Sequence, residues 1–129
     1  MPKKIFMTGT FDIIHPGHVE FIKYAREYGD SLTIAIDTDR RVNEKKGPDR
    51  PFHNQEDRQF VISSFKYVDA TVLFDSDEEL IEIVKELEPD VWFAGTDWWG
   101  KYFPGKEYAK SVKYFDRVEP HSTTRILEQ

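Results

Sequence analysis

The sequence contains no cysteine among its 129 residues. This absence excludes disulfide bonds, thiol nucleophiles, cysteine-ligated zinc and iron–sulfur clusters. Long apolar runs are also missing, since none approaches the roughly 18–20 residues that a membrane-spanning helix needs. Residues 1–7 likewise lack the apolar core of a secretion signal. We therefore expect a soluble, cytoplasmic protein that does not act at a membrane.

Positive charge is in short supply, because 18 Lys and Arg residues face 24 Asp and Glu residues and leave a net charge of −6. A broadly acidic surface repels phosphate backbones, so we expect no nucleic-acid partner, and any anion site must be a local basic pocket. Aromatic residues make up 15% of the chain, which is typical of a folded protein. The length suits one hydrophobic core, and we expect a single domain over residues 1–129.

Short apolar segments alternate along the chain with segments of helical periodicity. Strands are expected at Lys4–Thr8, Ser31–Ile36, Asp69–Phe74, Val91–Ala94 and Val112–Phe115. Helices are expected at Pro16–Tyr28, from Asn54 to about Phe65, at Asp77–Leu87 and at Ser122–Gln129. This alternation predicts an α/β protein, a Rossmann-like three-layer fold with a five-stranded parallel sheet covered by helices on both faces. Ligands of such sheets bind beyond the carboxyl ends of the strands, where we expect the active site.

The loop after the first expected strand contains two groups of residues that are suited to binding an anion. They are Gly9, Thr10, Phe11 and Asp12, followed by His15, Pro16, Gly17 and His18. Pro16 suits the first turn of a helix, and Gly17 lets a ligand approach the backbone. Both imidazoles and the helix N-terminus then converge on an anion-sized space. A His-x-x-His zinc site, with Asp12 as a third ligand, is a rival interpretation.

This segment resembles the signature of the cytidylyltransferase-like nucleotidyltransferases, which transfer a nucleoside monophosphate from a nucleoside triphosphate to a phosphate-bearing acceptor and release pyrophosphate. The resemblance implies a Rossmann-like fold of the nucleotidyltransferase type. It also implies that His15 and His18 are catalytic and that Asp12 binds substrate. The residues that it implies for nucleotide binding are Gly9, Thr10, Phe11 and Gly17.

A second motif near the C-terminus consists of Ser122, Thr123 and Thr124. Ser122 is a good helix N-cap, and capping alone would explain it. The resemblance implies that all three residues bind the β- and γ-phosphates of the nucleotide, and that Arg117 is a catalytic phosphate ligand. Pro120 and His121 depart from the family pattern, because proline has no N–H group to offer a phosphate. His121 is either a further phosphate contact or simply exposed.

Basic residues follow the second expected strand. Lys45 and Lys46 are expected in a loop, where a solvated run of charge is the plainer interpretation. The resemblance implies that Lys46 is catalytic and reaches the α-phosphate and the acceptor phosphate, while Lys45 binds substrate or takes the catalytic place instead. Arg58 heads an apolar helix stripe, so it needs a partner, either an Asp or a bound phosphate, because a buried unpaired charge is costly. The resemblance implies that Arg58 contacts substrate.

Asp97 and Trp98 follow the fourth expected strand, in a segment that resembles Gly-x-Asp-Trp-x-Gly-Lys of the glycerol-3-phosphate cytidylyltransferases. The resemblance implies that Asp97 binds the nucleotide and Trp98 the substrate. An aromatic loop packed on a neighbouring subunit is the plainer interpretation. The stretch from Lys46 to Arg58 is instead more similar to the sugar-phosphate nucleotidyltransferases that make ADP-heptose.

The leading hypothesis is therefore transfer of CMP from CTP to glycerol 3-phosphate, which gives CDP-glycerol and pyrophosphate by in-line attack on the α-phosphate. The alternative is adenylyl transfer from ATP to a sugar 1-phosphate of the ADP-heptose type. Mg²⁺ is expected through the nucleotide phosphates rather than at a protein metal site. The resemblance also implies a homodimer. A non-catalytic nucleotide-binding module and a zinc hydrolase remain alternatives of other classes.

Overall fold

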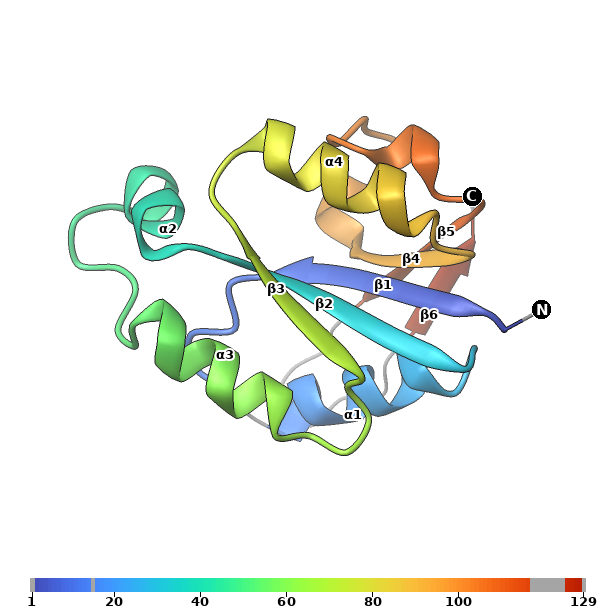
Figure 1. Ribbon diagram of the computed structural model, residues 1–129, viewed down its shortest axis with the longest axis horizontal. Helices are drawn as coiled ribbons and strands as arrows, with labels where there is room; N and C mark the ends of the chain where they lie inside the picture. The colour runs from blue at the N-terminus through green and yellow to red at the C-terminus, as the bar shows by residue number, and fades with distance from the viewer. Residues whose placement is uncertain (1, 15, 117–124, 129) are drawn as a thin grey trace.

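The apolar segments of the chain form one sheet of six strands (Figure 1). The structure is a computed structural model that describes residues 2–14, 16–116 and 125–128. The strands are β1 (Lys4–Gly9), β2 (Ser31–Asp37), β3 (Ala70–Phe74), β4 (Val91–Gly95), β5 (Val112–Asp116) and β6 (Arg125–Glu128). Their order in the sheet is β3-β2-β1-β4-β5-β6. The first five run parallel, whereas β6 pairs antiparallel with β5. The chain order reverses between β1 and β4, and ligands bind at such a switch point.

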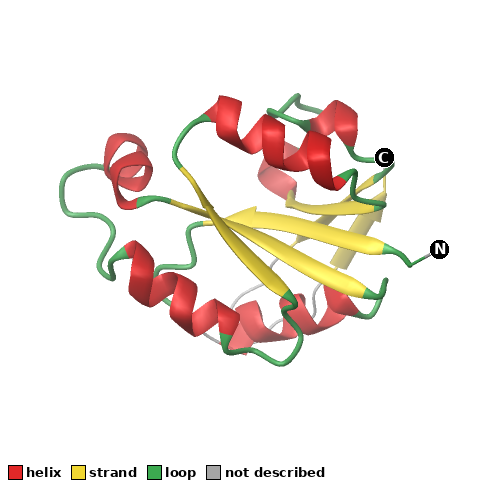
Figure 2. Cartoon of the chain, viewed as in Figure 1, coloured by secondary structure: helices red, strands yellow, loops and turns green. Residues whose placement is uncertain are grey.

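Helices cover both faces of the sheet, as Figure 2 shows in red against the yellow strands. They are α1 (Pro16–Arg26), α2 (Asp39–Lys46), α3 (Gln55–Ser63) and α4 (Asp77–Leu87), with the 3₁₀ turns η1 (Thr96–Trp98) and η2 (Lys106–Tyr108). Alternate residues of β1 enter different cores, because Ile5 and Met7 pack with α1 and α3, whereas Phe6 packs with α4. The predicted three-layer fold with five parallel strands is confirmed. None of the described helices is long and apolar enough to cross a membrane.

Capping residues mark where two of the helices begin. The side-chain oxygen of Asn54 accepts a hydrogen bond of 2.8 Å from the N–H of Asp57, which confirms the predicted cap of α3. The hydroxyl of Ser76 caps α4 in the same way by accepting from the N–H of Glu79. α4 occupies its predicted span, and the acidic residues of its first turn suit the helix dipole.

Two segments differ from the prediction. Residues 39–46 form α2, although the sequence predicts no helix there and places Lys45 and Lys46 in a loop, and Val42 is its one buried residue. The segment therefore has no apolar periodicity that would mark it as a helix. Residues Arg125–Glu128 form β6, so the helix predicted for Ser122–Gln129 is wrong over its described part. Pairing with β6 satisfies backbone groups that β5 would otherwise leave unpaired at the sheet edge.

Candidate active site at the carboxyl edge of the sheet

Gly9 and Phe11 shape the loop that leaves β1. Phe11 has a left-handed backbone, with φ of 52°, and its ring lies against Gly9. A Cβ atom at position 9 would lie 2.7 Å from Cε2 of Phe11, so any larger residue there would displace the ring. The same ring contacts the imidazole of His18 edge-on, with the ring centroids 6.3 Å apart. Glycine at position 9 thus lets the loop fold back until Phe11 packs beside His18.

His18 lies in the first turn of α1, which begins at Pro16. The first N–H groups of a helix have no intrahelical acceptor and favour an anion, and Gly17 adds no side chain that would screen them. Phe21 and Ile22, one turn further along, are buried in the core, while His18 is half-buried at the edge of the same face. The structure therefore places His18 and the start of α1 together at the carboxyl end of β1, as the sequence predicts.

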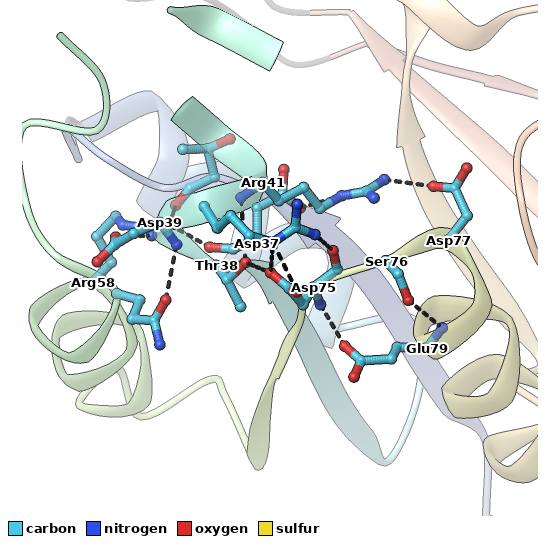
Figure 3. A network of polar contacts seen from close by, with 12 residues as sticks. Asp37, Thr38, Asp39, Arg41, Arg58, Asp75, Ser76, Asp77 and Glu79 are labelled. Atoms are coloured by element: carbon cyan, nitrogen blue, oxygen red, sulfur yellow. Dashed lines mark hydrogen bonds and ion pairs between the residues drawn. The ribbon is translucent and has the colours of Figure 1, made fainter. Parts of the chain in front are cut away.

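Arg58 is a buried charge that joins three segments of this edge. Its Nε donates to the carbonyl of His53 at 3.0 Å, and its Nη1 donates to the carbonyls of Thr10 and Asp37, each at 2.8 Å. Its Nη2 donates to the carboxylate of Asp39, also at 2.8 Å. The sequence predicts an Asp or a bound phosphate as the partner of this arginine, and Asp39 is that partner (Figure 3).

This geometry gives Arg58 a structural role, and its predicted contact with substrate stays a prediction. The side chain has no exposed surface, and its donors are directed at protein oxygens. A buried guanidinium is stable only with such a full set of acceptors. Arg58 is therefore a positioning residue, which fixes the loop after β1, the segment after β2 and the loop that leads into α3.

Asp12 also contacts the loop that leads into α3. Its two carboxylate oxygens accept hydrogen bonds from the backbone N–H groups of Phe52 and His53, at 2.7 and 2.8 Å. Burial alone would raise the pKa of Asp12, but these two N–H groups and the charges of His53 and Arg58 outweigh burial and lower the pKa below its usual value of 3.8. The structure gives Asp12 a positioning role, and its binding to substrate stays a prediction.

We expect Asp12→Asn to lower the free energy of unfolding by about 1 kcal/mol at pH 7, because one of two charge-assisted hydrogen bonds to partly exposed N–H groups is lost. A carboxyl whose folded pKa is depressed contributes stability above its unfolded pKa and loses that contribution as the pH falls through the folded value. The difference in the free energy of unfolding between wild type and Asp12→Asn should therefore close as the pH falls below 3.8. Urea unfolding at pH 7, 5 and 3 measures this difference, and the control is Asp49→Asn, in the loop between α2 and α3 that Asp12 contacts. A difference that is unchanged at pH 3 would contradict the assignment.

Lys45 and Lys46 form the last turn of α2 rather than a loop, which corrects the sequence prediction. Both side chains are exposed, and neither forms an ion pair with another residue of the described ranges. Two cations therefore face solvent near the carboxyl end of β2, where a phosphate group can reach them. Which of the two acts in catalysis stays a prediction.

Asp37, the last residue of β2, lies close to these lysines. Its side chain is 17% exposed and approaches Nε of Arg41 at 3.9 Å. Burial raises the pKa of the Asp37 carboxyl, although the positive charges of Arg41, Lys45, Lys46 and Arg58 act in the opposite direction. Sequence reasoning did not find this residue. The available signal was an acidic residue directly after an apolar strand, at the edge where ligands bind.

α2 is anchored by charge to the turn between β3 and α4 (Figure 3). Nε of Arg40 lies 2.9 Å from the carboxylate of Asp75, and Nη2 of Arg41 lies 2.7 Å from that of Asp77. The hydroxyl of Thr38 also donates to Asp75. These contacts fix the helix that carries the two lysines. The only sequence signal for the contacts is that residues of opposite charge follow two neighbouring strands.

Trp98 and Asp97 lie in η1, directly after β4. The Trp98 side chain is 45% exposed, and its ring centroid lies 5.9 Å from that of Phe103, which belongs to the core beside α4. Trp98 is thus partly packed against its own chain, and its substrate contact stays a prediction. The nucleotide contact predicted for the Asp97 side chain lies outside what the structure describes.

Seven further residues that the sequence singles out lie outside the described residues. They are His15, Arg117, Pro120, His121, Ser122, Thr123 and Thr124. Their roles stay predictions. Within residues 2–14, 16–116 and 125–128, no three His, Asp or Glu side chains are grouped so as to hold a metal ion.

Comparison with known proteins points to one family. The model of a family described as cytidylyltransferase-like matches residues 6–129. The bifunctional protein HldE of Campylobacter fetus is 38% identical over 125 residues, and that of a Nitratiruptor species is 42% identical over 125 residues. Each alignment covers 97% of this chain but 27% of the relative, so the chain spans about a quarter of the length of these curated relatives.

A solved structure is also similar to this chain. It is the lipopolysaccharide core biosynthesis protein from Thermoplasma volcanium, which superposes with a TM-score of 0.67 at 28% sequence identity. The superposition covers 75% of this chain and 77% of that one. The likeness therefore extends over most of both chains.

Proposed function

Because the chain belongs to the cytidylyltransferase-like family, we propose that it is a nucleotidyltransferase that moves AMP from ATP to a sugar 1-phosphate. The products would be an ADP-sugar of the ADP-heptose type and pyrophosphate. The observation that carries the proposal is the placement of His18 at the start of α1, at the carboxyl end of β1. The neighbouring strand β2 leads into α2, which ends in the exposed Lys45 and Lys46. A phosphorylated acceptor and a nucleotide triphosphate both need cations and helix N–H groups there.

The choice of ATP and a sugar 1-phosphate departs from the leading sequence hypothesis of CTP and glycerol 3-phosphate. Relatives named HldE are 36–42% identical to this chain. The similar solved structure carries a name from lipopolysaccharide core biosynthesis, and a saccharide polymer is built from activated sugars. The stretch from Lys46 to Arg58 resembles the ADP-heptose enzymes and agrees with them. CTP and glycerol 3-phosphate remain the second candidate, favoured by the segment that contains Asp97 and Trp98.

The reaction is a direct in-line displacement. An oxygen of the acceptor's phosphate attacks the α-phosphorus of the nucleotide, a new P–O bond forms, and the bond from the α-phosphorus to the bridging oxygen breaks. Pyrophosphate leaves with that oxygen. A phosphate monoester is already nucleophilic at neutral pH, so the protein's contribution is positioning and charge stabilisation.

The residues predicted to be catalytic or to bind the phosphates each have a role in this displacement. His15 and His18 stabilise charge on the α-phosphoryl and bridging oxygens, and Lys46 or Lys45 sits between the acceptor and the α-phosphate. Arg117 and the segment Ser122–Thr124 hold the departing pyrophosphate. Mg²⁺ belongs to the substrate in this scheme, because it prefers phosphate and water oxygens and dehydrates reluctantly. A homodimer is part of the same proposal.

Pyrophosphate release from purified protein with Mg²⁺ tests the proposal. ATP and CTP would each be paired with a heptose 1-phosphate and with glycerol 3-phosphate, and reactions without acceptor would control for hydrolysis. We expect release with ATP and the heptose phosphate. Release with CTP and glycerol 3-phosphate alone would move the protein to the second candidate. Nucleotide binding without release from any pair would support a binding module and overturn the proposed reaction.

A further inference from the structure

Asp37 is a partly buried carboxylate with unused hydrogen-bonding capacity. Its side chain is 17% exposed, yet no described residue donates a hydrogen bond to its carboxylate oxygens. Nε of Arg41 stops 3.9 Å short of it, beyond hydrogen-bond distance, and is itself buried without a partner in the described part of the chain. A carboxylate accepts about four hydrogen bonds, and leaving it short of donors costs free energy.

The backbone fixes where this carboxylate lies. The Asp37 carbonyl accepts from Nη1 of the buried Arg58, which also binds the carbonyl of Thr10 in the loop after β1. Asp37 is therefore held beside the loop that leads to His18, at the carboxyl end of β2. Figure 3 shows it among the side chains of α2 and α3.

The charges around Asp37 indicate what kind of ligand fits. Arg41, Lys45, Lys46 and Arg58 all act on its carboxylate electrostatically. The two lysines are exposed and suit a phosphate, whereas the carboxylate repels an anion and accepts hydrogen bonds from hydroxyl groups. A molecule with one phosphate and several hydroxyls satisfies both. A bare phosphate or an apolar acceptor satisfies only the lysines.

We propose that Asp37 accepts hydrogen bonds from hydroxyl groups of the acceptor sugar and selects polyhydroxylated acceptors. The inference rests on the proposed function and adds a specificity residue to it. The acceptor, rather than the ribose of the nucleotide, is the expected partner because the charges of the two lysines assigned to the acceptor phosphate act on the Asp37 carboxylate. One side chain would thus distinguish sugar phosphates from simpler phosphate esters.

A purely structural role is the competing explanation, since Asp37 and Arg41 form an i,i+4 pair that helps to seat α2. Asp77→Asn is the matched control, because it removes the other carboxylate of Arg41 at 2.7 Å while leaving Asp37 in place. If Asp37 only helps to hold α2 in place, the two substitutions should affect activity with every acceptor alike. If Asp37 binds hydroxyls, only its own substitution should change the preference among acceptors.

The experiment measures kcat/KM by pyrophosphate release for wild type, Asp37→Ala, the near-isosteric Asp37→Asn and Asp77→Asn. The acceptors are a hexose or heptose 1-phosphate and its 2-deoxy, 3-deoxy and 4-deoxy forms, and the nucleotides are ATP and its 2′-deoxy and 3′-deoxy forms. Wild type should prefer the full sugar over at least one deoxy form by about tenfold or more, the usual effect of a hydrogen bond to a charged group. In Asp37→Ala this preference should fall to about one, with KM for ATP unchanged, and Asp77→Asn should keep it.

Each other outcome overturns a distinct statement. An active wild type whose sugar preference survives Asp37→Ala and Asp37→Asn would overturn this inference and leave the proposed function intact. A loss of preference between ATP and its deoxy forms would show that Asp37 contacts the ribose, and would also overturn it. A wild type that is inactive with every pair would overturn the proposed function and the inference with it.

Discussion

His18→Ala should lower kcat of the proposed transfer at least ~10²-fold, which is the usual effect of removing one preorganised donor to a developing oxyanion. The imidazole lies in the first turn of α1, beside the N–H groups that favour an anion, and is held by the edge of the Phe11 ring. It is half-buried rather than part of the core, so folding should depend on it little. Saturating steady-state kinetics and a thermal melt on the same sample measure both effects.

His53→Ala is the matched control for this substitution. His53 is exposed, and it contributes to the site through its backbone, which donates to Asp12 and accepts from Arg58. Loss of its ring should leave kcat within about threefold of wild type. A His18→Ala protein that is folded and turns over at a near-normal rate would contradict the catalytic role of His18 and the displacement mechanism built on it.

The strands and the start of α3 were predictable because their signals are local. Apolar runs at β1, β2 and β4 mark strands that are buried on both faces, and Asn54 offers a cap oxygen to the N–H three residues on. α2 escaped prediction because its stability comes from outside the helix. One buried side chain, Val42, and ion pairs to residues after β3 replace the apolar stripe that a sequence pattern would show.

The residues of the candidate site were likewise predictable where their signal is local in sequence, and were missed where their role depends on distant contacts. The cluster around Gly9, Phe11 and His18 was visible because its members are neighbours in sequence, on one strand end and one helix start. Arg58 was correctly expected to need a partner, but a sequence pattern cannot tell whether that partner is an Asp or a bound phosphate. The acceptors of Arg58 are Asp39, 19 residues away, and three carbonyl groups, and no sequence motif reveals them. Asp37 was missed for a similar reason, because its importance comes from charges on two different helices.

Arg58→Met should lower the free energy of unfolding by about 1–3 kcal/mol, the usual cost of leaving buried polar groups without their hydrogen-bond partner. The substitution leaves the carboxylate of Asp39 and the carbonyls of Thr10, Asp37 and His53 without their donor. Domains of this size are stable by only about 5–15 kcal/mol, so the loss should be plain in urea unfolding at constant m-value. Activity should fall as well, since the same side chain sets the loop that leads to His18.

Arg40→Met is the control that separates a buried arginine from an exposed one. Arg40 has two carboxylate partners, Glu44 and Asp75, each at 2.9 Å, but its side chain is 59% exposed. Exposed pairs contribute about 0–1 kcal/mol, so this variant should unfold close to wild type. Adding Asp39→Asn to Arg58→Met should recover part of the loss, because the orphaned charge is then gone. If Arg58→Met proves as stable as Arg40→Met, the buried guanidinium does not hold these three segments together, and its predicted contact with substrate would become the better explanation of its presence.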